Sequence, residues 1–345
     1  MKHLPYFLAL MPALCSACLG ADADDAYKQP VANVADGRLE LQGNRNSFVP
    51  MYASMAWGQP RPEVTRVVAI FHGRTRNAAG YFRYAQEARA AAHAGDRDTL
   101  IVAPQFLAER DLEAHGLGPD CVRWKLSEWE GGADAIAPAP VSSFDVIDAL
   151  LAQLADAKTF PNLRQVVLAG HSGGGQILQR HAAVGLGGDA LAARGVKVRY
   201  VVSNPSSYLY FTDDRPAPDG KFRPPDAAQF PGFNLWKYGL KNAPRYVRET
   251  AEQAERRYTE CELIYLLGEA DSDPALSSLD KSPAAEAQGA SHYTRGLSYA
   301  HYMQIRHPGL AHRVLIAPGV GHDAHKIFTS PQGLAALFDV PLPER

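Results

Sequence analysis

The chain has 345 residues, of which 46% are hydrophobic. Its 35 lysine and arginine residues nearly balance 37 acidic residues, which gives a formal net charge of -2. This length is enough for one large core but modest for two independent enzymes. The even charge argues against nucleic acid as a partner, because no excess of basic residues is available for the phosphates.

Residues 1–20 have the pattern of a signal peptide. Lys2 and His3 give a short basic start, the segment from Leu4 to Leu19 is mostly apolar, and acidic residues begin at Asp22. This order is typical of a leader that is removed on export. We therefore expect a secreted or periplasmic protein with one domain over residues 21–345. No other segment is long and apolar enough to span a membrane.

The four cysteines are divided between this leader and the rest of the chain. Cys15 and Cys18 lie in the leader, which leaves Cys121 and Cys261 in the mature protein. An oxidising compartment would permit one disulfide between these two, and the sequence predicts it. Cys18 also leaves open a lipid anchor, but Cys15 stands where such an anchor usually has leucine.

Apolar β-branched runs alternate with helix-like segments along the chain, without internal repeats. The order favours a doubly wound, mostly parallel sheet covered by helices. Strands are expected at 67–71, 99–103, 166–169, 196–203, 262–267 and 313–316, and helices at 78–94, 143–157, 176–183 and 324–328.

The segment from Val166 to Gly175 carries the most specific signal. It places Ser172 between glycines at the end of an apolar strand and before a helix. A sharp turn from strand to helix crowds the backbone, so its neighbours must be small, and Gly170, Gly173 and Gly174 are. The pattern is typical of a nucleophile elbow, which predicts Ser172 as the catalytic nucleophile.

A candidate general base follows the last predicted strand. His322 lies in a glycine-rich turn between this strand and the helix-like segment 324–328. An imidazole at that place can take the proton from a serine hydroxyl. His325 comes three residues later, but with no carboxylate or thiolate at ligand spacing it does not predict a metal site.

A candidate acid lies between the serine and the histidine. The strand 262–267 ends in a turn that contains Glu269, Asp271 and Asp273. Asp271 is the first choice, because its carboxylate would hold the imidazole in the productive tautomer. Asp273 and Glu269 remain the alternatives.

Backbone N–H donors must also meet the negative oxygen that forms when serine attacks a carbonyl. The strand 67–71 runs into His72 and Gly73 at the place where the first donor is expected. Arg74 is assigned as that donor, with Gly73 as the near alternative. The N–H of Gly173 is the second donor.

These parts together resemble the α/β-hydrolase superfamily, in particular its secreted esterases and lipases. The resemblance rests on the turn at His72 and Gly73, the elbow at Ser172, the acid turn at Asp271 and the turn at His322, and it covers most of the chain. It implies a mostly parallel eight-stranded sheet flanked by helices and hydrolysis of esters or amides without a cofactor. The substrate is not implied, because the site and the lid insertions set it.

Two inserts at the carboxyl ends of strands are expected to shape the substrate pocket. The first, 104–141, contains Trp124 and Trp129, and the second, about 204–258, contains Tyr208, Tyr210 and Trp236 and is predicted to be a lid. Each of these aromatic residues is a candidate for substrate binding, with packing against the core as the alternative.

The sequence thus predicts an exported serine hydrolase that cleaves small or polymeric carboxylic esters through Ser172, Asp271 and His322. An acyl-enzyme intermediate is expected, with no cofactor and no metal. A peptidase or amidase of the same superfamily is one alternative, and a catalytically inactive binding protein on the same fold is another. No propeller-sized second domain is visible, which favours the esterase.

Overall fold

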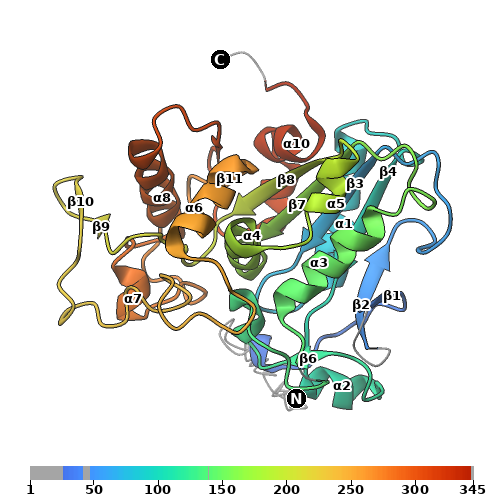
Figure 1. Cartoon of the computed structure of the whole chain (residues 1–345), viewed down its shortest axis with the longest axis horizontal. Coiled ribbons are helices and arrows are strands. Elements are labelled where there is room, and N and C mark those ends of the chain that lie inside the picture. The colour runs from blue at the N-terminus through green and yellow to red at the C-terminus, as the bar shows by residue number, and fades with distance from the viewer. Residues whose placement is uncertain (1–25, 42–46, 139, 343–345) are drawn as a thin grey trace, which may run out of the picture.

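An eight-stranded sheet organises the chain (Figure 1). The computed structural model describes residues 26–41, 47–138 and 140–342, so the predicted signal peptide at 1–20 lies outside the described residues. The sheet order is β1-β2-β4-β3-β7-β8-β11-β12. Its strands are β1 (Arg38–Glu40), β2 (Phe48–Ala53), β3 (Arg66–Phe71), β4 (Thr99–Pro104), β7 (Gln165–His171), β8 (Lys197–Ser203), β11 (Glu262–Gly268) and β12 (Arg313–Ala317).

The six strands from β4 to β12 are parallel, and only β1 and β2 run antiparallel to their neighbours. The central strands are buried almost throughout, as expected for a parallel sheet covered on both faces. The predicted mostly parallel eight-stranded sheet is confirmed. Its parallel strands all end at one edge, where Ser172, Asp271 and His322 follow three of them.

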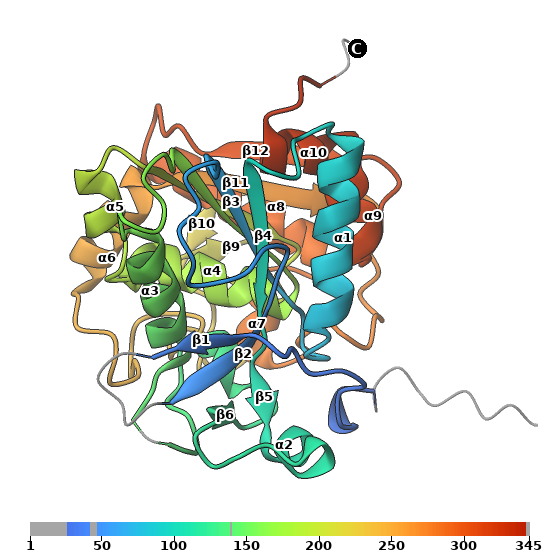
Figure 2. The same ribbon diagram turned by 90° about the vertical axis from the view of Figure 1, so that its right-hand side faces the viewer.

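Helices cover both faces of the sheet. Alternate residues of β3 point to opposite sides: Val67 and Phe71 join one core cluster, and Val68 and Ile70 join the other. One face carries α1 (Ala78–Ala91), α9 (Ala324–Thr329) and α10 (Pro331–Phe338), which lie together in Figure 2. The other carries α3 (Ser143–Leu154), α4 (Gly173–Val184), α5 (Asp189–Ala193), α6 (Ala251–Glu260) and α8 (His292–Arg306).

Short elements fill the long connections. They are the helices η1 (Ala26–Lys28), α2 (Glu109–His115), η2 (Glu128–Gly131) and α7 (Pro283–Glu286), and the two-residue strands β5 (Leu107–Ala108), β6 (Arg123–Trp124), β9 (Arg215–Pro216) and β10 (Phe222–Arg223). The segment 104–141 holds β5, α2, β6 and η2, and the segment 204–258 holds β9, β10 and the first part of α6. No described helix has the length and hydropathy to cross a bilayer.

The predicted disulfide is wrong, because both cysteines are free. Cys121 is fully buried in a small cluster with Phe48 and Leu107, whereas Cys261 caps the end of α6 and packs against the large core. Burial raises the pKa of each thiol to about 12, so neither thiol is a reactive thiolate at neutral pH. The number of cysteines outside the leader allows one pair, but the fold places Cys121 and Cys261 in separate apolar clusters.

Candidate active site

Ser172 lies in the strained turn between β7 and α4. Its backbone has φ 57° and ψ -117°, a conformation that side chains with a Cβ rarely adopt. The serine N–H donates to the Ser203 carbonyl at the end of the neighbouring strand β8, at 2.9 Å. The residue is therefore held by two adjacent strands and directs its side chain away from the sheet edge.

Close backbone contacts explain the glycines around Ser172. A Cβ on Gly170 would lie 2.4 Å from the Gly174 carbonyl, and one on Gly174 would lie 2.2 Å from the Phe71 carbonyl. A Cβ on Gly175 would lie 2.6 Å from the Ser203 carbonyl. The helix α4 thus presses directly on the ends of β3 and β8, and only glycine permits that approach.

Asp271 and His322 are joined by a hydrogen bond. The Nδ1 of His322 donates to Asp271 Oδ2 at 2.7 Å, and the aspartate is almost fully buried. The alternatives lie elsewhere: Asp273 accepts from the Ala275 N–H, Glu269 accepts from the Gly319 N–H, and both are exposed. Of the three acids that the sequence offered, the structure brings only Asp271 to the histidine.

A second histidine, His292 at the start of α8, shares this aspartate. Its Nδ1 donates to the other carboxylate oxygen, Asp271 Oδ1, at 3.1 Å. Burial lowers the pKa of His292 to about 4 and keeps the ring neutral, so Nε2 is unprotonated and accepts a hydrogen bond from the Ser206 hydroxyl at 2.8 Å. Burial alone would raise the pKa of Asp271, but the hydrogen bonds from His292 and His322 hold it well below its usual range.

His322 is sandwiched between two other imidazoles. The His292 ring stacks on it with centroids 4.0 Å apart and an interplanar angle of 21°, and the His171 ring lies at 4.4 Å. Burial also lowers the pKa of His171. Two neutral rings therefore lie against His322. His171 and His322 both line the cavity with Ser172, and His322 is the more exposed of the two. The sequence prediction missed His292, whose only local signal is the helix cap at Ser291.

The turn after β3 exposes a backbone donor near Ser172. The Phe106 N–H donates to His72 Nε2, so His72 Nδ1 carries the proton and donates to the Gly73 carbonyl at 2.8 Å. That carbonyl also accepts from the Arg76 N–H at 3.0 Å. The trans peptide between Gly73 and Arg74 is fixed, and in the described part of the chain the Arg74 N–H has no acceptor.

Gly173 supplies a second N–H that has no acceptor among the described residues, because the first N–H groups of a helix have no partner within it. A Cβ on Gly173 would lie 2.9 Å from Glu130 Oε1, so glycine leaves room for a buried carboxyl group there. Glu130 Oε2 accepts from Gln176 and lies 3.8 Å from Lys237 Nζ, while Oε1 has no described partner. Burial raises the pKa of Glu130, which disfavours a negative charge beside Gly173.

Ser172 and His322 line one cavity of about 330 Å³. The turn after β3, residues 73–75, and the described start of the chain at Tyr27 form part of its wall, and residues 276–278 from the loop after β11 form another part. No hydrogen bond joins the Ser172 hydroxyl to His322 among the described residues. Such contacts often tighten only when a substrate is bound, so the shared cavity is the informative observation.

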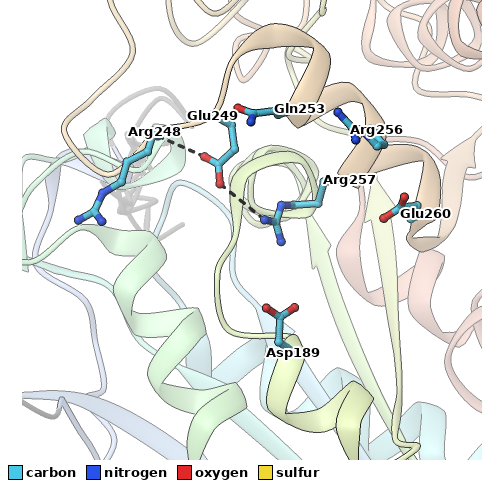
Figure 3. A pocket seen from close by; sticks show the side chains of 7 residues that line it. All are labelled: Asp189, Arg248, Glu249, Gln253, Arg256, Arg257 and Glu260. Atoms are coloured by element: carbon cyan, nitrogen blue, oxygen red, sulfur yellow. Dashed lines mark hydrogen bonds and ion pairs between the residues drawn. The ribbon is translucent and has the colours of Figure 1, made fainter.

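A different, larger cavity contains no such pair. It has a volume of about 520 Å³ and lies between α5 and the start and outer side of α6 (Figure 3). Its lining is charged, with Asp189, Arg248, Glu249, Arg256, Arg257 and Glu260 beside Gln253. Glu249 pairs with Arg257 at 3.7 Å, and no lining residue is a serine, cysteine or histidine.

Comparisons with known proteins identify the fold and not the activity. No protein-family model and no curated protein sequence matches the chain. Among solved structures, poly(aspartic acid) hydrolase-1 from Sphingomonas sp. KT-1 is similar with a TM-score of 0.58 at 22% identity, over 88% of this chain and 98% of that one. The LpqC poly(3-hydroxybutyrate) depolymerase from Bordetella parapertussis has a TM-score of 0.56 at 22% identity, over 89% and 91%. This chain has the α/β-hydrolase fold.

The five aromatic residues predicted to bind substrate do not line the cavity of this α/β-hydrolase fold. Trp124, Trp129, Tyr208 and Tyr210 are at most 1% exposed and belong to the large core. Trp236 packs against that core and donates from Nε1 to the Gly131 carbonyl. In this structure these five residues pack the two inserts against the core, and the cavity wall comes from other loops.

The same result changes the expectation for the predicted lid. The segment 204–258 contributes no residue to the wall of the cavity that holds Ser172. Its first part is instead anchored in the core through Tyr208 and Tyr210, which contact Tyr299 of α8. The loop that follows β11 lies at the rim instead.

In the described part of the chain, one group of three side chains has metal-ligand spacing. Single ligand atoms of His171, Asp271 and His322 lie within 4.8 Å of one another. Both oxygens of Asp271 already accept hydrogen bonds from His322 and His292. The donor set therefore favours a hydrogen-bond network over metal ligation. His325, the other histidine considered, contacts Glu87 on the surface.

The packing of the elbow predicts that Gly174→Ala destabilises the protein. The added methyl group would meet the Phe71 carbonyl, and we expect the free energy of unfolding to fall by about 3 kcal/mol, measured by urea denaturation. Gly188→Ala is the matched control, because a Cβ there meets nothing within 4 Å. Equal stability of the two variants would contradict this account of the elbow.

The buried His292 predicts acid sensitivity of the fold. A histidine with a pKa of about 4 in the folded state binds fewer protons than the unfolded chain between pH 6.5 and 4. Its contribution to stability is therefore present at neutral pH and is lost as the pH falls through this range. In His292→Gln, which keeps an N–H for Asp271 but does not titrate, the pH slope of the unfolding free energy should be smaller by up to about 1.4 kcal/mol per pH unit. Identical slopes in urea titrations of both proteins would refute this.

Proposed function

We propose that this chain is an exported serine hydrolase that cleaves carboxylic esters, with Ser172 as nucleophile, His322 as general base and Asp271 as the acid that orients it. The observation that carries the proposal is the shared cavity. His322, hydrogen-bonded to a buried carboxylate, and Ser172, on a strained turn, line the same 330 Å³ space. The leader-like residues 1–20 support export to the periplasm or the medium.

The first half of the proposed reaction transfers the acyl group. Ser172 Oγ attacks the ester carbonyl while His322 Nε2 takes its proton. Asp271 accepts from His322 Nδ1, which keeps Nε2 available as the base and stabilises the imidazolium. The N–H groups of Gly173 and Arg74 are the donors proposed for the negative oxygen. His322 then protonates the leaving alcohol, and an acyl-enzyme remains.

The second half consumes water. His322 takes a proton from a water molecule that attacks the acyl carbon, and the second tetrahedral intermediate meets the same two N–H groups. Collapse of this intermediate returns the proton to Ser172 and releases the acid. The neutral, buried state of His171 and His292 is consistent with a single imidazole that carries the proton through both halves.

Loss of the nucleophile tests the proposal directly. Ser172→Ala should lower kcat on 4-nitrophenyl acetate by roughly 10⁴-fold or more, because no other group forms the acyl-enzyme. The unaltered protein should also be labelled by a fluorophosphonate at Ser172, located by peptide mapping, and the variant should not be. Near-normal turnover in a folded Ser172→Ala protein would exclude this mechanism, and a protein with neither turnover nor labelling would favour a binding role.

The acid is tested by a pair of isosteric changes in one loop. Asp271→Asn removes the charge that orients His322 and should lower kcat by roughly 10⁴-fold. Asp273→Asn should have little effect, because Asp273 is exposed and accepts only from the Ala275 N–H. Initial rates on the same ester measure both, and a larger loss in Asp273→Asn would move the acid to that residue.

A further inference from the structure

The side chain of Arg74 gives the candidate cavity a single permanent charge. Among the described residues that line the cavity, Arg74 is the only arginine, lysine or acidic residue. The remaining polar groups there are hydroxyls and the two histidines, and the hydroxyls include those of Tyr27, Thr75 and Ser277. The permanent charge in the described wall of this cavity is therefore positive and comes from Arg74.

Within the described residues, the Arg74 guanidinium has no acidic partner. No described residue forms an ion pair or a hydrogen bond with its guanidinium. The charge of Arg74 acts to lower the pKa of Glu130, but the two side chains lie beyond ion-pair distance. Surface arginines in this chain commonly have such partners, as Arg223 and Arg245 do. A half-buried guanidinium with free donors beside a nucleophile is suited to an anionic ligand.

The guanidinium is nevertheless held in one orientation. Its carbon lies over the Tyr27 ring, 4.0 Å from the ring centroid, in a cation–π contact. The Tyr27 carbonyl accepts from Arg76 Nη1 at 2.7 Å, and Arg76 is fixed by a fully buried ion pair with Asp111. The cation–π contact uses none of the N–H donors of Arg74, and within the described residues they remain available to a planar carboxylate.

We propose that Arg74 binds a carboxylate of the substrate, so that the preferred esters carry a negative charge near the scissile bond. This proposal rests on the function proposed above and adds a substrate class to it. The N–H and the side chain of Arg74 leave the same residue. When the carbonyl oxygen of a substrate lies at that N–H, a carboxylate within the length of one arginine side chain from this carbonyl can therefore meet the guanidinium.

Two esters with the same leaving group and acyl length test the proposal. One is mono-4-nitrophenyl adipate, which ends in a carboxylate, and the other is 4-nitrophenyl adipamate, which ends in a neutral amide of similar shape. The measured quantity is the ratio of kcat/KM for the acid to that for the amide, after subtraction of spontaneous hydrolysis. The ratio cancels any change that a variant makes at the shared oxyanion donors or in the folded fraction.

The unaltered protein should prefer the acid. Arg74→Gln should lower the ratio at least tenfold, which corresponds to about 1.4 kcal/mol of a charge-assisted hydrogen bond, and Arg74→Lys should retain part of the preference because the charge remains. Arg256→Gln is the matched control for loss of one positive charge. It is exposed on α6 in the separate cavity of Figure 3 and should leave the ratio unchanged.

An unchanged ratio in Arg74→Gln would overturn the proposal and leave Arg74 with the task of holding Tyr27. A preference of the unaltered protein for the neutral amide would overturn it as well. If the unaltered protein cleaves neither ester and a fluorophosphonate does not label Ser172, the proposed hydrolase function itself fails, and the substrate class fails with it.

Discussion

The close contact of α4 with the ends of β3 and β8 is the constraint on which the candidate site depends. Backbone atoms of Phe71 and Ser203 lie so near to the helix that Gly174 and Gly175 have no room for side chains. This contact holds Ser172 at a positive φ and brings the first turn of α4 to the turn that carries Arg74. A serine hydroxyl, two free N–H groups and the end of a parallel sheet meet because the backbone can approach itself there.

Charge in the site is controlled by burial. Three imidazoles lie in one stack, yet two of them are buried with lowered pKa values, and Glu130 is buried with a raised one. Asp271 is the exception, since two donated hydrogen bonds keep it ionised in spite of its burial. The negative charge of Asp271 therefore lies behind His322, the most exposed imidazole of the stack. The pKa shifts of His171, His292 and Glu130 favour the neutral form of each neighbouring group.

Local signals in the sequence were sufficient for the parts of the fold that are local. The β-branched runs predicted the central strands within a residue or two, and strand, turn and helix around Ser172 predicted the elbow. The antiparallel strands β1 and β2 were not predicted, because β1 has only three residues and β2 contains a proline, Pro50. His292 was missed because it reaches Asp271 only through the packing of α8, and no spacing in the sequence encodes that contact.

The aromatic residues and the cysteines show what local signals leave undetermined. A tryptophan in a long insert has the same sequence signature whether it lines a cavity or anchors the insert, and here Phe106 stacks on Trp129 in the core. The cysteine pair was inferred from number alone, while two separate apolar clusters decide where the thiols lie.

The two described ends of the chain lie at opposite edges of the sheet. Tyr27 forms part of the cavity wall at the carboxyl edge. Asp339, after α10, pairs with Arg66 at the start of β3, on the amino edge. A surface tether or a fusion partner joined beyond residue 339 therefore starts from the face away from the cavity, whereas one joined just before residue 27 starts at its mouth. Immobilisation through the C-terminal side therefore leaves the approach to Ser172 open.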